Sequence, residues 1–273
     1  MTTAIKVQGL SHVYPPNIVG LREVTLEIES ADFLAVLGQN GSGKTTLVKH
    51  FNGILKPTQG KVYIEGVDTS GKSIAELSRK VGYVFQNPDH QICFETVRKE
   101  VAFGPHNLGL SDDEVASRVD EMTRLLGLEE VMDSPPAMLG LGERRKVTLA
   151  SVLGMKPSIL ILDEPTTGID RKGVIDIMQA VTDLNARGHT IILITHNMRV
   201  AAKYTRKALV LLNGEVLLHD TTKKLFASPE TLEKTSLSPP RITQLAQKMQ
   251  RMGIPKDVLT VEEFCEKIMP LMR

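Results

Sequence analysis

The sequence predicts an α/β fold, because short apolar runs that suit buried strands alternate with segments whose apolar residues recur at helical spacing. The apolar runs are 33–37, 159–162 and 191–194. Between the last two runs, the apolar residues from Val174 to Leu184 have helical spacing, and Gly188 stands where a helix C-terminus is capped. We therefore expect a βαβ unit within a mixed or parallel sheet that helices cover on both faces.

Composition and charge are those of an ordinary globular chain. Of the 273 residues, 41% are hydrophobic and 24% are charged, which excludes disorder as the main state. Lys and Arg number 33 and Asp and Glu number 32, so the net charge of +1 provides no overall field for nucleic acid. No nucleic-acid partner is expected.

The sequence gives no sign of export or of membrane insertion. Its apolar runs are far shorter than the roughly 20 residues that a membrane-spanning helix needs, and Met1–Lys6 lacks the apolar stretch of a secretory signal. Cys93 and Cys265 lie far apart without metal-ligand spacing, which argues against a disulfide framework and a zinc site. We expect the chain in a reducing compartment, the cytosol.

The middle and the end of the chain differ from this core. Helical periodicity replaces the strand signal over about 87–153, where Ser111 and Glu114 predict a capping box, and we expect an inserted helical subdomain there. Asn213-Gly214 predicts a β-hairpin. Residues 236–240 predict a linker before helices at 242–249 and 261–269. We therefore divide the chain into a domain at 1–230 and a small C-terminal helical extension at 231–273.

The segment Gly38–Thr45 matches the P-loop pattern of Gly, four residues, Gly, Lys, then Ser or Thr. It lies between the predicted strand 33–37 and a predicted helix that contains Leu47 and Phe51, as a P-loop requires. Its glycines allow backbone N–H groups to surround phosphates, and the helix N-terminus adds the positive end of its dipole. Lys44 supplies a positive charge and Thr45 a hydroxyl for Mg²⁺. The sequence thus predicts a magnesium-dependent phosphate site.

Polar residues follow the two other predicted strands. Asp163 and Glu164 follow 159–162, where one carboxylate can hold Mg²⁺ and the next can act as general base on the attacking water. His196 follows 191–194, where a ring nitrogen can reach a γ-phosphate. Alone, an acidic pair or a histidine after a strand is often structural, and it is the P-loop that makes the functional interpretation the stronger one.

These motifs make the chain resemble an ATP-binding subunit of an ABC transporter over roughly residues 4–230. The resemblance implies a P-loop ABC ATPase fold: a RecA-like core with an antiparallel β subdomain, the helical subdomain, and ATP and Mg²⁺ as cofactors. It also implies an adenine-stacking role for Tyr14, a Q-loop role for Gln86, a switch role for His196 and a D-loop contact of Asp170 with a partner subunit. The residues implied to bind nucleotide are Tyr14, Gly38, Asn40, Gly41, Ser42, Gly43, Lys44, Thr45 and Thr46. Those implied to be catalytic are Lys44, Gln86, Glu164 and His196, and those implied to bind Mg²⁺ are Thr45, Gln86 and Asp163.

Further strings resemble the ATPases of energy-coupling-factor importers, including the cobalt and nickel type. They are Phe85–Gln91, Val101–Pro105, Asn107–Leu110, Pro239–Ala246 and Leu259–Glu263. The last two resemble an extension that helps hold the ATPase dimer in that group; the alternative is a helical tail packed on its own domain. The resemblance implies a peripheral protein at the cytoplasmic face of the cell membrane. Its implied partners are a second ATPase subunit, a transmembrane coupling protein, and a membrane component that selects the metal ion or vitamin.

One motif departs from the family. The signature Leu-Ser-Gly-Gly-Gln reads Leu139-Gly140-Leu141-Gly142-Glu143 here, without the serine hydroxyl that contacts the γ-phosphate bound by the other subunit. Leu141 adds a side chain where close backbone approach is needed, and Glu143 adds a carboxylate near a triphosphate. We expect this chain to hydrolyse ATP when a partner supplies a standard signature, and to complete the partner's site poorly.

Three other functions fit parts of the pattern. The altered signature also suits a regulatory nucleotide-binding subunit with weak hydrolysis of its own, or the chain energises another class of ABC transporter. A soluble ABC-type ATPase that acts on DNA or ribosomes is disfavoured, because the chain has neither long coiled-coil insertions, nor two ATPase units, nor a basic stripe.

Overall fold

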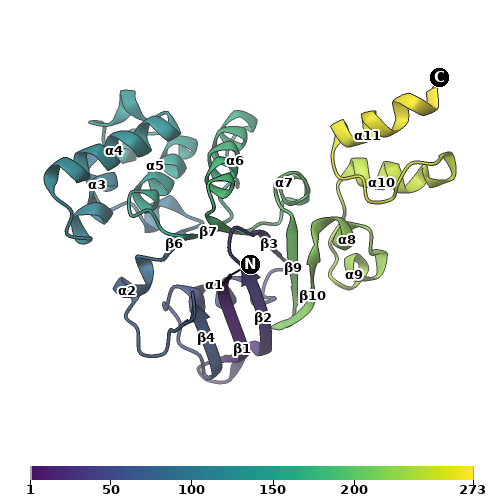
Figure 1. Cartoon of the computed structure of the whole chain (residues 1–273), viewed down its shortest axis with the longest axis horizontal. Coiled ribbons are helices and arrows are strands. Elements are labelled where there is room, and N and C mark those ends of the chain that lie inside the picture. Colours follow the sequence, from purple (N-terminus) through teal and green to yellow (C-terminus); the bar gives the residue numbers. More distant parts are fainter. Residues whose placement is uncertain (1, 273) are drawn as a thin grey trace.

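The computed structural model describes residues 2–272 and contains two sheets (Figure 1). The larger has the strand order β10-β9-β3-β8-β7-β6, with parallel pairs from β9 to β6 and β10 antiparallel to β9. Its strands are β3 (Phe33–Leu37), β6 (Val81–Val84), β7 (Ile159–Asp163), β8 (Thr190–Ile194), β9 (Lys207–Leu212) and β10 (Glu215–Thr221). Every residue of β3, β6, β7 and β8 is buried, which explains their continuous apolar runs and confirms the predicted mixed α/β sheet.

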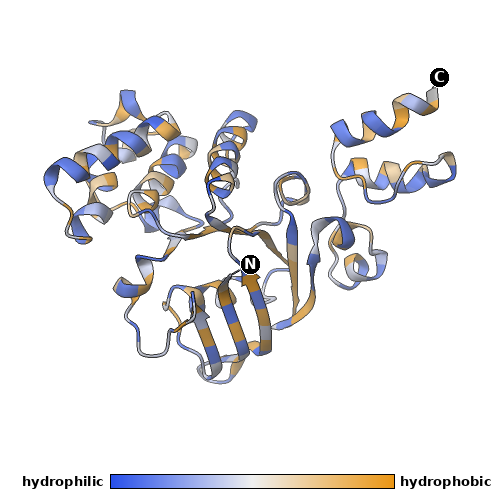
Figure 2. Ribbon diagram, in the orientation of Figure 1, coloured by the Kyte–Doolittle hydropathy of each residue, from blue (hydrophilic) through white to orange (hydrophobic). Residues whose placement is uncertain are grey.

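The second sheet is antiparallel and has the order β2-β1-β4-β5. Its strands are β1 (Thr3–Tyr14), β2 (Ile18–Glu29), β4 (Gln59–Ile64) and β5 (Val67–Asp68). β1, β2 and β4 show alternating hydrophobic and hydrophilic bands (Figure 2), as expected of strands with one buried face. The buried face packs with the P-loop helix against the larger sheet in one cluster, which includes Ile5, Leu21, Leu47 and Phe51.

Helices cover the larger sheet and fill the predicted helical segment. α1 (Lys44–Phe51) follows β3, α6 (Arg171–Ala186) joins β7 to β8, and α7 (Met198–Tyr204) follows β8. α2 (Ile74–Ser78) precedes β6, and α3 (Val97–Asn107), α4 (Asp112–Leu126) and α5 (Leu141–Leu153) pack together between β6 and β7. The capping box of Ser111 and Glu114 is confirmed, as is Gly188, which follows α6 with φ 97°. Short 3₁₀ turns lie at Pro88–His90, Glu129–Val131, Pro136–Met138, Gln250–Met252 and Met269–Met272.

The chain ends in four short helices. α8 (Thr222–Phe226) and α9 (Pro229–Lys234) were not predicted, whereas α10 (Arg241–Lys248) and α11 (Val261–Ile268) match the predicted helices to within one residue at each end. α10 and α11 lie at the end of the molecule opposite to α3–α5 (Figure 1). Two polar contacts attach them to α8, from Lys223 Nζ to Glu263 at 2.7 Å and from Gln247 Nε2 to the Phe226 carbonyl at 2.9 Å.

Asn213 and Gly214 form the predicted hairpin turn between β9 and β10, and both have positive φ, 50° and 83°. This is the conformation that favours Asn-Gly in two-residue turns. Within residues 2–272, no helix combines the length and apolar character needed to cross a membrane.

Candidate functional site

The P-loop connects β3 to α1, and its backbone folds around the side chain of Lys44. The Lys44 Nζ donates hydrogen bonds to the carbonyls of Gly38 and Gln39, both at 2.8 Å. Burial lowers the pKa of Lys44, and the carboxylates of Glu164 and Asp163 act in the opposite direction. A triphosphate can replace the two carbonyls as the partner of this ammonium group.

Two of the P-loop glycines are required by space as well as by conformation. Gly38 has φ 143°, and a Cβ there would lie 2.4 Å from the Leu211 carbonyl oxygen. Gly43, the residue before α1, has φ 100°, and a Cβ there would lie 2.7 Å from the Gly20 carbonyl oxygen. The pattern of glycines in this loop is therefore explained by the close approach of β2 and β9.

Asp163 lies at the carboxyl end of β7 and is buried. Tyr83, on the neighbouring β6, donates its hydroxyl to Asp163 Oδ2 at 2.8 Å. Burial raises the pKa of Asp163, although this hydrogen bond and the ammonium groups of Lys49 and Lys44 oppose the shift. A carboxylate whose charge is disfavoured by burial gains much from a cation beside it.

Glu164 is held by three of its neighbours. Its Oε1 lies 2.7 Å from His196 Nδ1, and its Oε2 accepts a hydrogen bond from the Thr167 hydroxyl at 3.2 Å. Its backbone N–H donates to the Ile194 carbonyl at 3.0 Å, which ties the turn after β7 to β8. The φ of Glu164 is 50°, a left-handed conformation that is unfavourable for a residue with a side chain.

One cavity of about 670 Å³ brings most of the predicted site residues together. Its lining includes Tyr14, Asn40, Gly41, Gly43, Lys44, Thr45, Thr46, Gln86, Asp163, Glu164 and His196. Gly38 and Ser42 are buried within the loop itself. The oxygen atoms of Thr45, Gln86 and Asp163 are the type of ligand that Mg²⁺ prefers, so this set of residues fits that cation.

Tyr14 stands at the edge of this cavity, at the end of β1. Its hydroxyl lies 3.1 Å from the Thr46 hydroxyl, and the ring of His12 packs edge-on with its centroid 4.4 Å away. A Cβ on Gly20 would lie 2.9 Å from Tyr14 Cε2, so a larger residue at position 20 would displace the ring. The tyrosine is thus fixed beside the P-loop helix.

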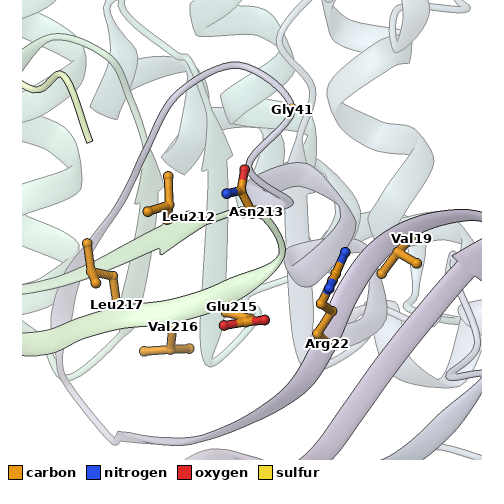
Figure 3. Close-up of a pocket in the computed structure, with 8 residues that line it drawn as sticks. All are labelled: Val19, Arg22, Gly41, Leu212, Asn213, Glu215, Val216 and Leu217. Atoms are coloured by element: carbon orange, nitrogen blue, oxygen red, sulfur yellow. The ribbon is translucent and has the colours of Figure 1, made fainter. Parts of the chain in front are cut away.

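A second cavity, of about 490 Å³, lies where Gly41 approaches the β9–β10 hairpin (Figure 3). Its polar side chains are Arg22, Asn213 and Glu215, and it contains neither Lys44 nor the Asp163 carboxylate. The P-loop lysine, Thr45 and the acidic pair all line the cavity of about 670 Å³, so we place the candidate site there.

The altered signature and Asp170 do not line the larger cavity. Gly140 precedes α5 as its N-cap, and its N–H donates to Glu143 Oε2 at 3.1 Å, so this carboxylate is turned towards its own helix. Leu141 packs on the loop of residues 165–170 that follows the acidic pair, the D-loop of the family resemblance, where a Cβ on Gly168 would lie 3.1 Å from Leu141 Cδ2. The side chain of Asp170 accepts the N–H of Gly173 at 2.8 Å and caps α6.

Sequence reasoning missed three residues that support the site. Tyr83 stands within a buried strand and Thr167 within a loop, so neither carried a signal. Arg145 belongs to the basic run 144–146, which is usually solvated, yet it is buried with 6% exposure and contacts the turn that carries Glu164. Its position five residues into a helix that follows the signature was the one available clue.

The parallel strands of the larger sheet carry a P-loop after β3 and an acidic pair at the end of β7, which is separated from β3 by β8 alone. This arrangement is typical of a P-loop ATPase. The family model for ABC transporters matches residues 21–167. An energy-coupling factor transporter ATP-binding protein EcfA2 from Caldanaerobacter subterraneus subsp. tengcongensis is 42% identical over 279 residues, which covers 98% of each chain. Another EcfA2, from Acetivibrio thermocellus, is 40% identical and covers 99% of each.

Solved structures agree. The structure of cbiO1 from Clostridium perfringens, described as part of the ABC transporter complex cbiONQ, aligns with a TM-score of 0.78 and 36% identity, covering 90% of this chain and 100% of that one. A dimeric ATP-binding cassette, MJ0796, bound to ADP and Pi, aligns with a TM-score of 0.72 and 29% identity over 80% of this chain and 98% of its own. The chain belongs to the ABC transporter family, as an ATP-binding subunit, and it is an ATPase.

Proposed function

We propose that this ATPase energises a membrane importer of the energy-coupling-factor type, for metal ions such as cobalt or nickel or for vitamins. The observation that carries the proposal is the similarity to transporter ATP-binding proteins of this name along 98% of the chain, which includes the tail beyond the ATPase domain. In such a machine two ATPase subunits close on ATP, separate after hydrolysis and move the helices of a membrane partner.

The site residues take the following roles in this proposal. Tyr14 stacks on adenine, and the segment from Gly38 to Thr46 with Lys44 binds the phosphates. Thr45, Gln86 and Asp163 hold Mg²⁺, which neutralises phosphate charge when bound. Glu164 accepts a proton from the attacking water, and its contact with His196 at 2.7 Å orients the carboxylate.

The position of Glu164 supports its role as general base. Its side chain lines the same cavity as Lys44, and its 10% exposed carboxylate is shielded from bulk water. The His196 ring is 68% exposed, which leaves it free to contact a phosphate while Nδ1 stays on Glu164. A water between the carboxylate and the γ-phosphate is the nucleophile that this geometry accommodates.

The ATPase domain at 1–230 works as one half of a dimer in this proposal, and the extension at 231–273 contributes to dimerisation. Asp170 and residues 139–143 face the second ATPase subunit. Gly140 and Leu141 cannot supply the signature hydroxyl, so the simplest assembly is a heterodimer whose partner carries a standard signature. The dimer binds a transmembrane coupling protein and a substrate-binding membrane component, as a peripheral protein at the cytoplasmic face.

MgATP turnover by the purified chain, measured as a function of its concentration, tests this assignment. Glu164→Gln is the inactive control, and we expect it to bind ATP but to lose on the order of 10²–10⁴-fold in turnover, as the loss of a general base predicts. Turnover that rises more steeply than concentration shows a working homodimer. Binding without turnover shows that a second ATPase is needed. Turnover that survives Glu164→Gln contradicts the role of this residue.

A second candidate is a regulatory subunit that closes on ATP and hydrolyses it weakly. The specific observation in its favour is the altered signature, in which Leu141 packs on Gly168 of the D-loop. Turnover in the membrane complex separates the two. If the chain is regulatory, the wild-type complex and a complex that carries Glu164→Gln in this chain alone have equal transport rates. The importer proposal expects a lower transport rate in the variant complex.

A further inference from the structure

Arg145 is a buried cation next to the turn that carries Glu164. It is the fifth residue of α5, and its side chain reaches the loop after β7. Its Nη1 donates to the carbonyl of Glu164 at 3.0 Å and its Nη2 donates to the carbonyl of Thr167 at 2.7 Å. One guanidinium group therefore spans both ends of the four-residue turn 164–167, which begins with Glu164.

This arrangement is unfavourable for stability alone. Burial lowers the pKa of Arg145, against the effect of the Glu164 carboxylate, which means that the charged form is poorly solvated. Its Nε is buried and has no hydrogen-bond partner among the described residues. Apolar side chains of similar size usually stabilise such a position as well as or better than a buried charge. The guanidinium is therefore better explained by what it holds in place.

The turn that it holds is strained and carries the proposed base. Glu164 has a φ of 50°, which a side chain disfavours, and such a conformation persists only where the surroundings fix it. The Glu164 N–H is bonded to β8 and its carboxylate to His196 and Thr167. The bonds from Arg145 connect this turn to α5, the helix that begins within the signature, at Leu141.

We propose that Arg145 is a positioning residue that ties the signature helix to the turn bearing Glu164, so that the placement of α5 sets the placement of the carboxylate in the same subunit. The inference rests on the role of Glu164 as general base proposed above. α5 also accepts a bond from the segment 85–91, which contains Gln86: Gln91 Nε2 donates to the Thr148 carbonyl at 3.1 Å, while Gln91 Oε1 accepts the Phe85 N–H at 3.0 Å. The helix is thus connected both to the turn that carries Glu164 and to the segment that carries Gln86.

The test compares Arg145→Met and Arg145→Lys with Lys146→Met in the full chain, under whichever assembly shows MgATP turnover. Lys146 is the matched control, because it is the next residue of α5 and its Nζ contacts Asp176 on α6 at 2.8 Å, away from the turn. We expect Arg145→Met to lower kcat by about ten-fold or more, since a displacement of roughly 1 Å can cost on the order of 100-fold. The KM for ATP should stay within about two-fold.

Arg145→Lys distinguishes positioning from charge. Lysine keeps the charge but replaces the two Nη atoms of the fork with one ammonium nitrogen, so it cannot reproduce both bonds in the same geometry. We therefore expect kcat to recover in part and to remain about three-fold or more below wild type. If Arg145→Met does not fold, the kcat of Arg145→Lys tests the positioning role without it. Hydrogen exchange gives a readout without turnover: the Thr167 amide, bonded to the Glu164 carbonyl at 3.3 Å, should exchange about five-fold faster or more in the Arg145 variants and unchanged in Lys146→Met.

Two outcomes overturn the inference. One is a kcat in Arg145→Lys equal to wild type with Thr167 exchange unchanged. The other is an equal loss of kcat in Lys146→Met, which would indicate general disturbance of α5. The Glu164→Gln control separates this failure from failure of the proposed base. Full turnover in Glu164→Gln contradicts the role of Glu164 as general base. Loss of turnover in Glu164→Gln, together with wild-type kcat and unchanged Thr167 exchange in Arg145→Lys, contradicts only the positioning role of Arg145.

Discussion

In the dimer that we propose, two edges of the chain meet across the interface, and they differ in how well they follow the family motifs. The nucleotide edge, residues 38–46, 86, 163–164 and 196, matches the family at each motif, and its residues gather around one cavity. The signature edge, residues 139–143 and 170, departs at three of five signature positions. Its polar groups are bonded within their own helices, as Glu143 is to Gly140 and Asp170 is to Gly173.

This difference shows that the two halves of a composite site can change independently. The nucleotide edge is built from contacts between strands and loops of one chain, so a change there disturbs its own binding site. In the proposed dimer the signature edge completes the nucleotide site of the other subunit. In this chain α5 still forms, with Gly140 as its N-cap and the Glu143 carboxylate on the Gly140 N–H. A chain can therefore lose the second function without a cost to its own fold.

Restoring the signature should reduce the difference between the two edges more than any other change. Gly140→Ser with Leu141→Gly returns the hydroxyl and the close backbone approach, and a hydrogen bond to a charged phosphate contributes about 1.5–3 kcal/mol. In an assembly of this chain with itself, we expect turnover per subunit to rise about 10- to 100-fold. Steady-state MgATP hydrolysis at saturating chain concentration measures it.

The matched control for that variant is Gly140→Ala with Leu141→Gly, which opens the backbone but supplies no hydroxyl. We expect it to gain less than the serine variant. Because serine is also a strong N-cap, the thermal stability of both variants should be recorded, so that a stabilised α5 is not mistaken for a restored contact. Equal turnover in wild type and the serine variant would show that the signature edge is not limiting.

A change on the nucleotide edge, at Tyr14, should have a smaller effect, on the affinity for ATP. Removal of an aromatic stacking surface costs about 1–3 kcal/mol per base, so Tyr14→Ala should raise the dissociation constant for ATP about ten-fold. Tyr14→Phe keeps the ring and loses only the contact with the Thr46 hydroxyl at 3.1 Å, and its affinity should stay near wild type. Titration of both variants with ATP provides the measurement. Unchanged affinity in Tyr14→Ala would exclude stacking.

The smallest expected effect concerns the packing beneath Tyr14. His50, on α1, places Nδ1 2.7 Å from the Thr46 carbonyl, to which it must donate, so its Nε2 is left to accept from His12 Nδ1 at 3.1 Å. A second proton on His50 would place two N–H donors, His50 Nε2 and His12 Nδ1, against each other. Burial accordingly lowers the pKa of His50 from 6.5 to about 4.

The sign of the pH effect follows from that shift. Below pH 6.5 the unfolded chain binds a proton at His50 that the folded chain takes up only near pH 4, so stability falls by about 1.4 kcal/mol per pH unit in this window. The free energy of unfolding should therefore drop by about 1 kcal/mol more in wild type than in His50→Gln between pH 7 and 5.5. Equal pH dependence in the two proteins would contradict a neutral, buried His50.

The strands and motifs that the sequence predicted are those in which one short segment carries all the information. The P-loop, the buried runs 33–37, 159–162 and 191–194, the Asn213-Gly214 turn and the Ser111 cap each depend on local residues, and the structure confirms their conformations. The roles of the residues on the nucleotide edge remain predictions, although the cavity brings nearly all of them together.

What the sequence could not predict depends on distant contacts. β1 and β2 were not located, because register shifts near Leu10 and His12 divide their alternating pattern into stretches too short to recognise in the sequence. α8 and α9 have five and six residues, too few for a helical period to be recognised. Tyr83 and Arg145 acquire their importance from partners 80 and 19 residues away, which no local pattern encodes.

The C-terminal helices have a hydrophobic cluster of their own, in which Ala246, Ile254, Val258 and Phe264 are buried. Two far larger clusters lie in the ATPase domain, and a third joins it to the extension through Leu232 and Leu259. A unit with so few buried side chains of its own has little cooperative stability, so we expect it to open on heating before the remainder of the chain melts. Nucleotide bound at the P-loop should then raise the melting temperature of the ATPase domain and leave that first transition of the isolated chain where it was.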